Sequence, residues 1–317
     1  MATTFKPLSQ NDIISTKTLL HENIPLTGTI VSGTYAADAN IKTYSHGMFQ
    51  SVYDYPYLSS SANHIFDITF GYSNQSVLSS STGTPVQRAK KINIYNQMAQ
   101  LLVGYDSTGS ILQFDEDGNL AGSGGAKIKE AVFMSFSRLL VKDEVKKGSF
   151  ALTIGGEHRR ATANVFDSAH LVTITDAQGS DSFRINSPAG EYGVLYATGN
   201  IRDAAWDALN IAGRAITLNN KNYVPVGLIY YQAGVVVLTS SVFSSAQDTE
   251  SAHRGYLDNG TDSTEWTSTS NNIIQDLVSS SIDDNASALR RRFKNVSVNN
   301  TTELNSTIYF CRVNHNE

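Results

Sequence analysis

The chain has 317 residues, of which 17% are charged, with 24 Lys and Arg against 29 Asp and Glu. This balance excludes a basic nucleic-acid binder, and a hydrophobic share of 40% argues against wholesale disorder. The 37 serines and 27 threonines make up about a fifth of the chain. We therefore expect a surface that is rich in hydroxyl groups and poor in charge.

The N-terminal residues, the longest apolar run and the cysteine content predict the cellular compartment in which the chain folds. Residues 1–7 contain no basic segment followed by an apolar one, so we expect no secretory signal. The most apolar run, 226–238, is shorter than the roughly 20 residues that span a bilayer. Cys311 is the single cysteine, which predicts no intrachain disulfide and folding in a reducing cytosol. Its apolar neighbours predict that it is a small buried hydrophobe.

The first half of the chain is predicted to mix strands and helices. Residues 24–31 and 64–70 are rich in β-branched and aromatic side chains, which is typical of strands. A helix is predicted over 87–103, where Ile94, Met98 and Leu101 share one face.

A second helix is predicted over 127–145, because Ile128, Val132, Phe136 and Leu139 recur at helical spacing. Between the two helices, residues 111–120 are expected to form a hairpin that turns on an Asp-Gly pair. Either apolar helix face could serve as domain core or as a subunit contact, and core is the preferred interpretation.

The period of the apolar residues changes to two after residue 148, which indicates β-structure. One short helix is predicted over 202–209, within this region. The last two predicted strands are apolar on both faces, as in a sandwich core. The predicted strands are 149–154, 170–175, 192–197, 224–231 and 235–238.

The last part of the chain begins with a polar stretch, 247–272, that has the composition of a loop. Helices are predicted over 272–280 and 283–293, and a strand over 306–313. The predicted class is α+β and β-rich, with an antiparallel sandwich-like domain and an N-terminal domain that contains helices.

Three segments follow from these elements. Residues 1–147 form a mixed domain with two amphipathic helices, and 148–245 form the sandwich-like domain. Residues 246–317 are predicted to supply a polar linker, helices and a C-terminal strand that returns to the N-terminal domain.

No catalytic constellation stands out, and we predict no catalytic, cofactor-binding or metal-binding residues. The seven histidines lie in no metal-binding spacing. The acidic run Asp115, Glu116 and Asp117 resembles a calcium loop, but Leu120 and Ala126 occupy the positions that need Gly and Glu. A turn is the better interpretation.

Two further motifs have plain interpretations. The glycine-rich residues 122–127 lack the Gly-Lys-Ser/Thr of a phosphate-binding loop, which favours a flexible linker. Arg290, Arg291, Arg292 and Lys294 form the one basic cluster. It could meet an acidic partner, but a solvated helix face is preferred.

Three segments together resemble structural proteins of large contractile-tailed, T4-like bacteriophages. The first is Val-Lys-Asp-Glu-Val-Lys-Lys-Gly-Ser-Phe-Ala-Leu at 141–152. The second is the strand pair at 226–239, with glycines flanking Tyr230 and Tyr231, and the third is the terminal strand at 308–317. The three segments together cover roughly a tenth of the chain.

The resemblance implies a virion component of the baseplate wedge type. Its partners would be other tail or baseplate proteins and copies of itself, with no nucleic acid, no membrane insertion, no cofactor and no enzymatic activity. It would be located in the virion after assembly in the host cytoplasm.

Two alternatives remain open. The β-rich composition and 15 tyrosines also suit a host-attachment or glycan-binding module. A hydrolase acting on cell wall or polysaccharide would have to use acids such as Asp115, Glu116 and Asp117.

Overall fold

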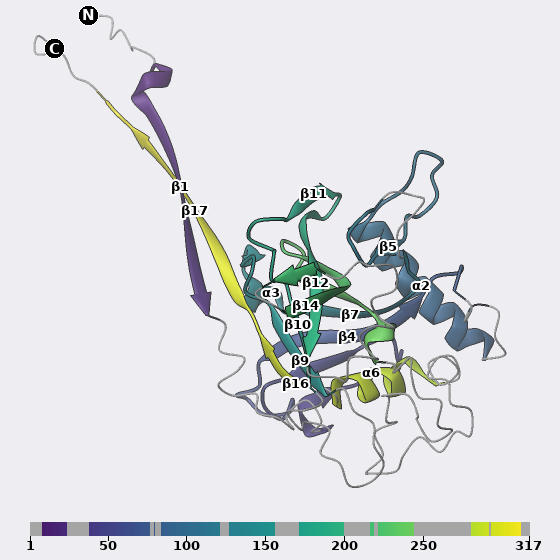
Figure 1. Ribbon diagram of the computed structural model, residues 1–317. Coiled ribbons are helices and arrows are strands. Elements are labelled where there is room, and N and C mark those ends of the chain that lie inside the picture. Colours follow the sequence, from purple (N-terminus) through teal and green to yellow (C-terminus); the bar gives the residue numbers. More distant parts are fainter. Residues whose placement is uncertain are drawn as a thin grey trace, which may run out of the picture.

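The computed structural model consists of a body built on one large sheet and a long ribbon that projects from it (Figure 1). The sheet is antiparallel throughout and helices are few, which confirms the predicted α+β, β-rich class. The structure describes residues 8–23, 38–76, 79, 84–120, 127–155, 171–199, 216–218, 221–243, 280–291 and 293–311.

Twelve strands form the sheet of the body. Ten of them lie side by side in one path, and the other two pair with members of that path. In spatial order the path is β16 (Phe293–Ser297), β9 (Ala151–Gly155), β10 (Leu171–Thr175), β12 (Gly190–Gly199), β14 (Lys221–Tyr230), β15 (Val235–Thr239), β7 (Glu130–Phe136), β4 (His64–Tyr72), β3 (Gln50–Tyr53) and β2 (Ile41–Lys42). The two additional strands are β11 (Arg184–Ser187), beside β12, and β13 (Ile216–Leu218), beside β14.

The sheet curls around a core to which both of its ends contribute. Phe66 of β4 and Phe293 of β16 lie near opposite ends of the path, yet their ring centroids are 6.1 Å apart. Helix α6 (Ile282–Arg291) packs against β3, β4 and β16, and its Ala286 and Leu289 are buried in the same core. The curled sheet therefore encloses its core between two layers, as a sandwich does.

The outer face of the sheet has a second core beneath helix α2 (Pro85–Leu102), which confirms the helix predicted over 87–103. Tyr95 of α2 donates a hydrogen bond from its hydroxyl to the carbonyl of Ile128 at 2.6 Å. Its ring lies edge-on to that of Phe114, with centroids 5.5 Å apart. Gly71 of β4 lets the helix backbone come close to the sheet.

The helix predicted over 127–145 is wrong. Its residues form β6 (Lys127–Ile128), β7, the short helix α3 (Arg138–Val141) and β8 (Glu144–Val145). In β7, Val132 and Met134 enter the inner core, while Ala131 and Phe133 enter the outer one. A central strand that is covered on both faces has an unbroken apolar run, so its period of two is hidden.

The hairpin predicted over 111–120 is wrong in its pairing. The strand β5 (Phe114–Asp115) pairs with β6 instead of with residues inside that range. The expected turn is present, because the Gly118 nitrogen donates to the Asp115 carbonyl at 3.2 Å and Gly118 has a φ of 77°. Glycine suits this conformation because it has no Cβ.

The strands predicted after residue 148 correspond to β9, β10, β12, β14 and β15, and the helix predicted over 283–293 corresponds to α6. One sheet takes β4 and β7 from segment 1–147, β9 to β15 from 148–245 and β16 from 246–317. The elements predicted over 24–31, 202–209, 247–272 and 272–280 lie outside the described residues, apart from Ser280.

Candidate assembly surface

Among the described elements, the ribbon formed by β1 (Ile13–Asn23) and β17 (Asn299–Tyr309) is exposed over most of its length. The two strands pair over eleven positions, from Ile13 opposite Tyr309 to Asn23 opposite Asn299, with no register shift. At about 3.4 Å per residue, such a ribbon is about 37 Å long. It leaves the body near α3 and extends into open space (Figure 1).

Large apolar side chains lie exposed on this ribbon. Tyr309 is 59% exposed and Ile308 is 49% exposed. Isolated apolar residues on a surface are common, but a row of them on one projecting element indicates a contact surface. The exposed apolar residues of the ribbon and its tip are Ile13, Ile14, Leu19, Leu20, Leu304, Ile308, Tyr309 and Phe310.

The two faces of the ribbon differ in charge. Residues directly opposite each other in an antiparallel pair point to the same face, so the register assigns every side chain. Lys17 and Glu303 are the only charged residues at positions 13–20 and 302–309, and both lie on one face, 2.5 Å apart. The opposite face, here named the uncharged face, consists of Ile14, Thr16, Thr18, Leu20, Thr302, Leu304, Ser306 and Ile308.

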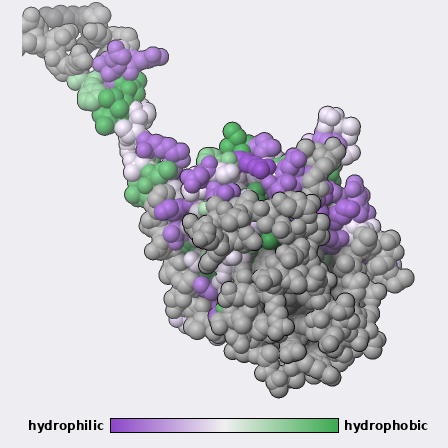
Figure 2. All heavy atoms as spheres, in the orientation of Figure 1, coloured by the Kyte–Doolittle hydropathy of each residue, from purple (hydrophilic) through white to green (hydrophobic). Residues whose placement is uncertain are grey.

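Apolar and hydroxyl residues also alternate along the ribbon. Green patches lie at its far part and again nearer the body, with paler and purple residues between them (Figure 2). We name the first the distal patch, which consists of Ile13, Ile14, Ile308, Tyr309 and Phe310. The proximal patch consists of Leu19, Leu20 and Leu304, and the hydroxyl belt between them of Ser15, Thr16, Ser306 and Thr307.

The outer edge of β1 is a long, regular strand edge without a partner among the described strands. Natural sheets usually protect their edges with short strands, bulges or covering elements. The body follows this practice, since β2 has two residues and β16 has a register shift. β1 has eleven residues, no proline and no shift, so its backbone groups remain open to another chain.

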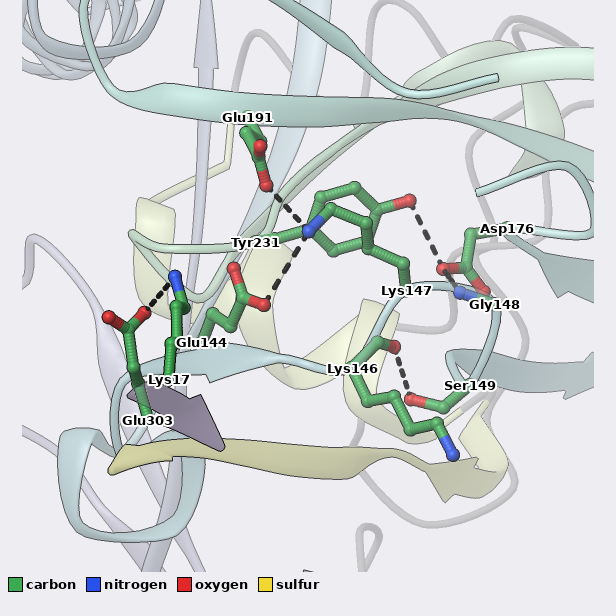
Figure 3. Close-up of polar contacts among 10 residues, drawn as sticks. All are labelled: Lys17, Glu144, Lys146, Lys147, Gly148, Ser149, Asp176, Glu191, Tyr231 and Glu303. Atoms are coloured by element: carbon green, nitrogen blue, oxygen red, sulfur yellow. Dashed lines mark hydrogen bonds and ion pairs between the residues drawn. The ribbon is translucent and has the colours of Figure 1, made fainter. Parts of the chain in front are cut away.

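A turn at residues 146–149 fixes the ribbon to the body (Figure 3). Ser149 accepts a hydrogen bond from the Asn299 nitrogen at 3.1 Å, and the Lys146 nitrogen donates to the Asn299 carbonyl at 2.9 Å. Asn299 is the first residue of β17. The Val145 nitrogen donates to the Tyr231 carbonyl at 3.0 Å, so the same segment also contacts the sheet.

Asp176 organises the buried side of this turn. Its carboxylate accepts hydrogen bonds from the Gly148 nitrogen at 2.6 Å, the Phe150 nitrogen at 2.9 Å and the Tyr231 hydroxyl at 3.2 Å. Burial raises the pKa of Asp176 to about 6, although these three donors favour the charged form. Asp176 therefore links β10's end, the turn and Tyr231 in one polar cluster (Figure 3).

Lys147 closes the exposed side of the same turn. Its ammonium nitrogen lies 2.5 Å from a Glu191 oxygen and 3.5 Å from a Glu144 oxygen. It also lies 4.8 Å from the centre of the Phe183 ring and 5.5 Å from that of Tyr231. These polar groups bind one another and so stabilise the turn. We name the turn at residues 146–149 and the side chains that contact it the joint.

Two predictions about single residues are wrong. Cys311 is exposed, because it follows the end of β17 on the ribbon rather than lying in a buried strand. Arg290 is 2% exposed, and its Nε donates to the Gln50 side chain at 3.2 Å, so it is not on a solvated helix face. The apolar run before Cys311 predicted burial, and the charge of Arg290 predicted exposure. Neither prediction holds, because a local sequence pattern does not show which other elements cover a side chain.

The residues that were predicted to form either the core or a subunit contact are now divided into buried and exposed ones. Ile94, Val132 and Phe136 are buried in the two cores, whereas Leu101 at the end of α2 is 61% exposed. Met98 is partly buried against the outer core. Core was therefore the correct interpretation for most of these residues.

The acidic run forms a turn held by a lysine. Asp115 is fully buried and lies 3.0 Å from the Lys127 ammonium nitrogen, and it accepts from the Asp117 nitrogen at 3.1 Å. Burial raises the pKa of Asp115 to about 6. Among the described residues, no group of three or more His, Cys, Asp or Glu side chains is placed to hold a metal ion.

The ribbon itself was missed by sequence reasoning, apart from the end of β17. A signal was present, because Ile13, Ile14, Thr16 and Thr18 are β-branched residues that favour strands. The three segments that resemble phage tail proteins lie in the turn beside the ribbon, in the central strands of the sheet and in the ribbon itself. Residues 141–152 contain the joint, 226–239 contain β14 and β15, and Ile308 and Tyr309 lie in the ribbon.

Comparison with known proteins gives no match: no family model, curated protein or solved structure is similar to this chain. Within the described part of the chain, no helix is long and apolar enough to cross a membrane.

Proposed function

We propose that the chain is a structural component of a bacteriophage virion, in the tail baseplate, and that it acts by protein–protein assembly through its ribbon. One observation carries this proposal. An eleven-residue strand pair with an open edge exposes large apolar side chains on both faces. Such an element gains stability when a neighbouring protein covers it.

Physical chemistry supports the need for a neighbour. A two-stranded ribbon is marginally stable in water, and three or more strands or a packed face are needed for independent stability. An open apolar edge is also an aggregation hazard that isolated proteins avoid. A permanent assembly removes both problems, because partners bury the edge and the apolar patches.

The resemblance of three segments to T4-like tail proteins supports the baseplate assignment. Two of those segments, 141–152 and 308–317, include residues of the joint and the ribbon. The low share of charged residues, 17%, suits a subunit that buries much of its surface against others.

The proposal is tested in phage particles that carry Leu20→Ser together with Leu304→Ser, which removes two of the three leucines of the proximal patch. We expect the copy number of the chain in purified particles, measured by quantitative mass spectrometry, to fall at least tenfold. Because both side chains are exposed, the body should keep its unfolding temperature.

Leu139→Ser is the matched control, since Leu139 is 88% exposed on the body, and it should leave incorporation unchanged. Absence of the unmodified chain from particles, or normal incorporation of the double variant, would contradict the proposal.

A host-attachment or glycan-binding role is the alternative. Tyr55 and Tyr57 are exposed between β3 and β4, beside Asp54 and Asn63, which bond to each other at 2.8 Å. Exposed rings beside polar side chains are a common form of sugar-binding surface. Glycan-array binding that Tyr57→Ala abolishes would favour this role over assembly alone.

A further inference from the structure

We propose that the uncharged face of the ribbon packs against the same face of other copies of this chain, with the ribbons aligned in the same direction around a common axis. The inference rests on the proposed assembly function and names the partner of the ribbon. Three features of the ribbon lead to it: the segregation of its charges, the order of its apolar and hydroxyl layers, and its area.

The segregation of charge indicates which face is buried. The ion pair of Lys17 and Glu303 lies on one face, with 58% and 34% of the two side chains exposed, and there it remains in contact with water. Over positions 13–20 and 302–309, the opposite face has eight residues and no charge. Burying that face against a neutral surface therefore desolvates no ion, whereas burying the other face would desolvate both members of the pair.

The order of the layers indicates that the neutral surface is a copy of the same face. From the tip inward, the uncharged face presents Ile14 with Ile308, then Thr16 with Ser306, and then two mixed layers, Leu304 with Thr18 and Leu20 with Thr302. When copies align in one direction, each layer meets its own equivalent. Aliphatic groups then contact aliphatic groups, and hydroxyls, which both donate and accept, bond to hydroxyls.

The area of the uncharged face predicts a weak contact between any two ribbons. Positions 13–20 span about 24 Å, and two strands are about 10 Å wide, so one face offers roughly 240 Å². Stable interfaces bury about 800 Å² on each partner, so a simple pair of ribbons forms a weak contact. In a closed ring, each ribbon touches two neighbours and buries more of its surface. We therefore expect association that depends on protein concentration and that other virion contacts strengthen.

The test uses single cysteines in the full-length chain with Cys311→Ser, which removes the exposed native thiol. Thr16→Cys places a thiol in the centre of the uncharged face, and Ser15→Cys places one on the opposite face at the next position. Both native residues are exposed, so neither change should disturb the fold. Packed sheets lie about 10 Å apart, so a bis-maleimide of that span is the suitable cross-linker.

We expect Thr16→Cys to give at least tenfold more covalent dimer than Ser15→Cys at equal protein concentration. Equal yields from the two variants, or no dimer from Thr16→Cys at any concentration up to the solubility limit, would overturn the inference.

A charge at the same position provides a second measurement. In the Cys311→Ser background, Thr16→Glu should weaken self-association at least tenfold in sedimentation equilibrium, whereas Ser15→Glu should leave it nearly unchanged. Circular dichroism and the unfolding temperature confirm that both variants are folded. Equal effects of the two glutamates would overturn the inference.

The outcome is separable from that of the proposed function. Cross-linking is repeated inside purified particles, where the amount of the chain is measured independently. Incorporation that depends on Leu20 and Leu304, without a Thr16→Cys dimer in either preparation, would retain the assembly function and reject self-packing. Dimer formation by a chain that particles lack would retain self-packing and reject the virion role.

Discussion

Asp176 shows how one buried side chain joins two parts of the molecule. Its carboxylate accepts hydrogen bonds from Gly148, Phe150 and Tyr231, and Gly148 belongs to the turn that holds the first residue of β17. A buried carboxylate normally destabilises the folded protein when it is charged. Here the three hydrogen-bond donors offset part of that free-energy cost. The position of the ribbon therefore depends on a titratable group that lies inside the body.

Stability should depend on pH through Asp176. Burial raises its folded-state pKa to about 6 from an ordinary value of 3.8, so the folded protein holds more protons than the unfolded chain between these values. The stabilisation from its proton is complete below about pH 4 and is lost as the pH rises to about 6. The full shift of about two units corresponds to about 3 kcal/mol in the free energy of unfolding.

Urea unfolding at pH 4.5 and pH 7 measures most of this change, and Asp176→Asn should reduce it. Asp115, whose pKa burial also raises to about 6, contributes in the same direction, so Asp115→Asn is the matched comparison. An Asp176→Asn variant with an undiminished change between the two pH values would contradict the assignment.

Helix α2 illustrates the element scale, because its position depends on one residue of the strand below it. A Cβ placed on Gly71 of β4 would lie 2.7 Å from the Lys91 carbonyl oxygen and 2.9 Å from the Tyr95 nitrogen. Both are backbone atoms of α2, so the helix would have to move as a unit. The buried rings of Tyr95 and Phe114 would then lose their contact.

We expect Gly71→Ala to lower the free energy of unfolding by roughly 1–3 kcal/mol, as overpacking in a core does. Leu101→Ala, at an exposed position of the same helix, should change it by less than about 0.5 kcal/mol. Chemical denaturation followed by fluorescence measures both variants. Equal losses would show that close packing at Gly71 is not the cause.

Sequence patterns predicted the elements that have one buried and one exposed face, because their apolar residues recur at the spacing of a helix or a strand. The helix with Ile94 and the strands β9 and β10 are of this kind, whereas β14 and β15 were recognised as short runs that are apolar on both faces. β7 was mistaken for a helix because Val132 and Met134 face one core while Ala131 and Phe133 face another. The pairing of β1 with β17 joins residues almost 300 positions apart, which no local pattern specifies. The candidate surface therefore required the structure.

At the scale of the whole molecule, a well-packed body and a thin ribbon should differ in local stability. The body has two cores that cover both faces of its sheet, whereas the ribbon beyond its root exposes both of its faces. Regions with few buried contacts open at low free-energy cost. The ribbon should thus fluctuate while the body remains folded.

Hydrogen exchange measures this difference. We expect the amides of residues 13–20 in the dilute protein to exchange about 100-fold faster than those of Val132 and Met134 in β7. Association should slow exchange in the ribbon and leave β7 unchanged. Ribbon amides as protected as those of β7 in the dilute chain would contradict the expectation.

The ribbon's direction also determines how it transmits force. β1 begins and β17 ends at the same remote point, where the Phe310 nitrogen donates to the Asp12 carbonyl at 2.8 Å. Tension that pulls these two strand ends apart opens the ribbon like a zipper, with one hydrogen-bonded pair under load at a time. Tension applied along the ribbon by a neighbour seated on its face loads many pairs at once in shear. The same eleven pairs thus form a weak joint in one direction and a strong tether in the other.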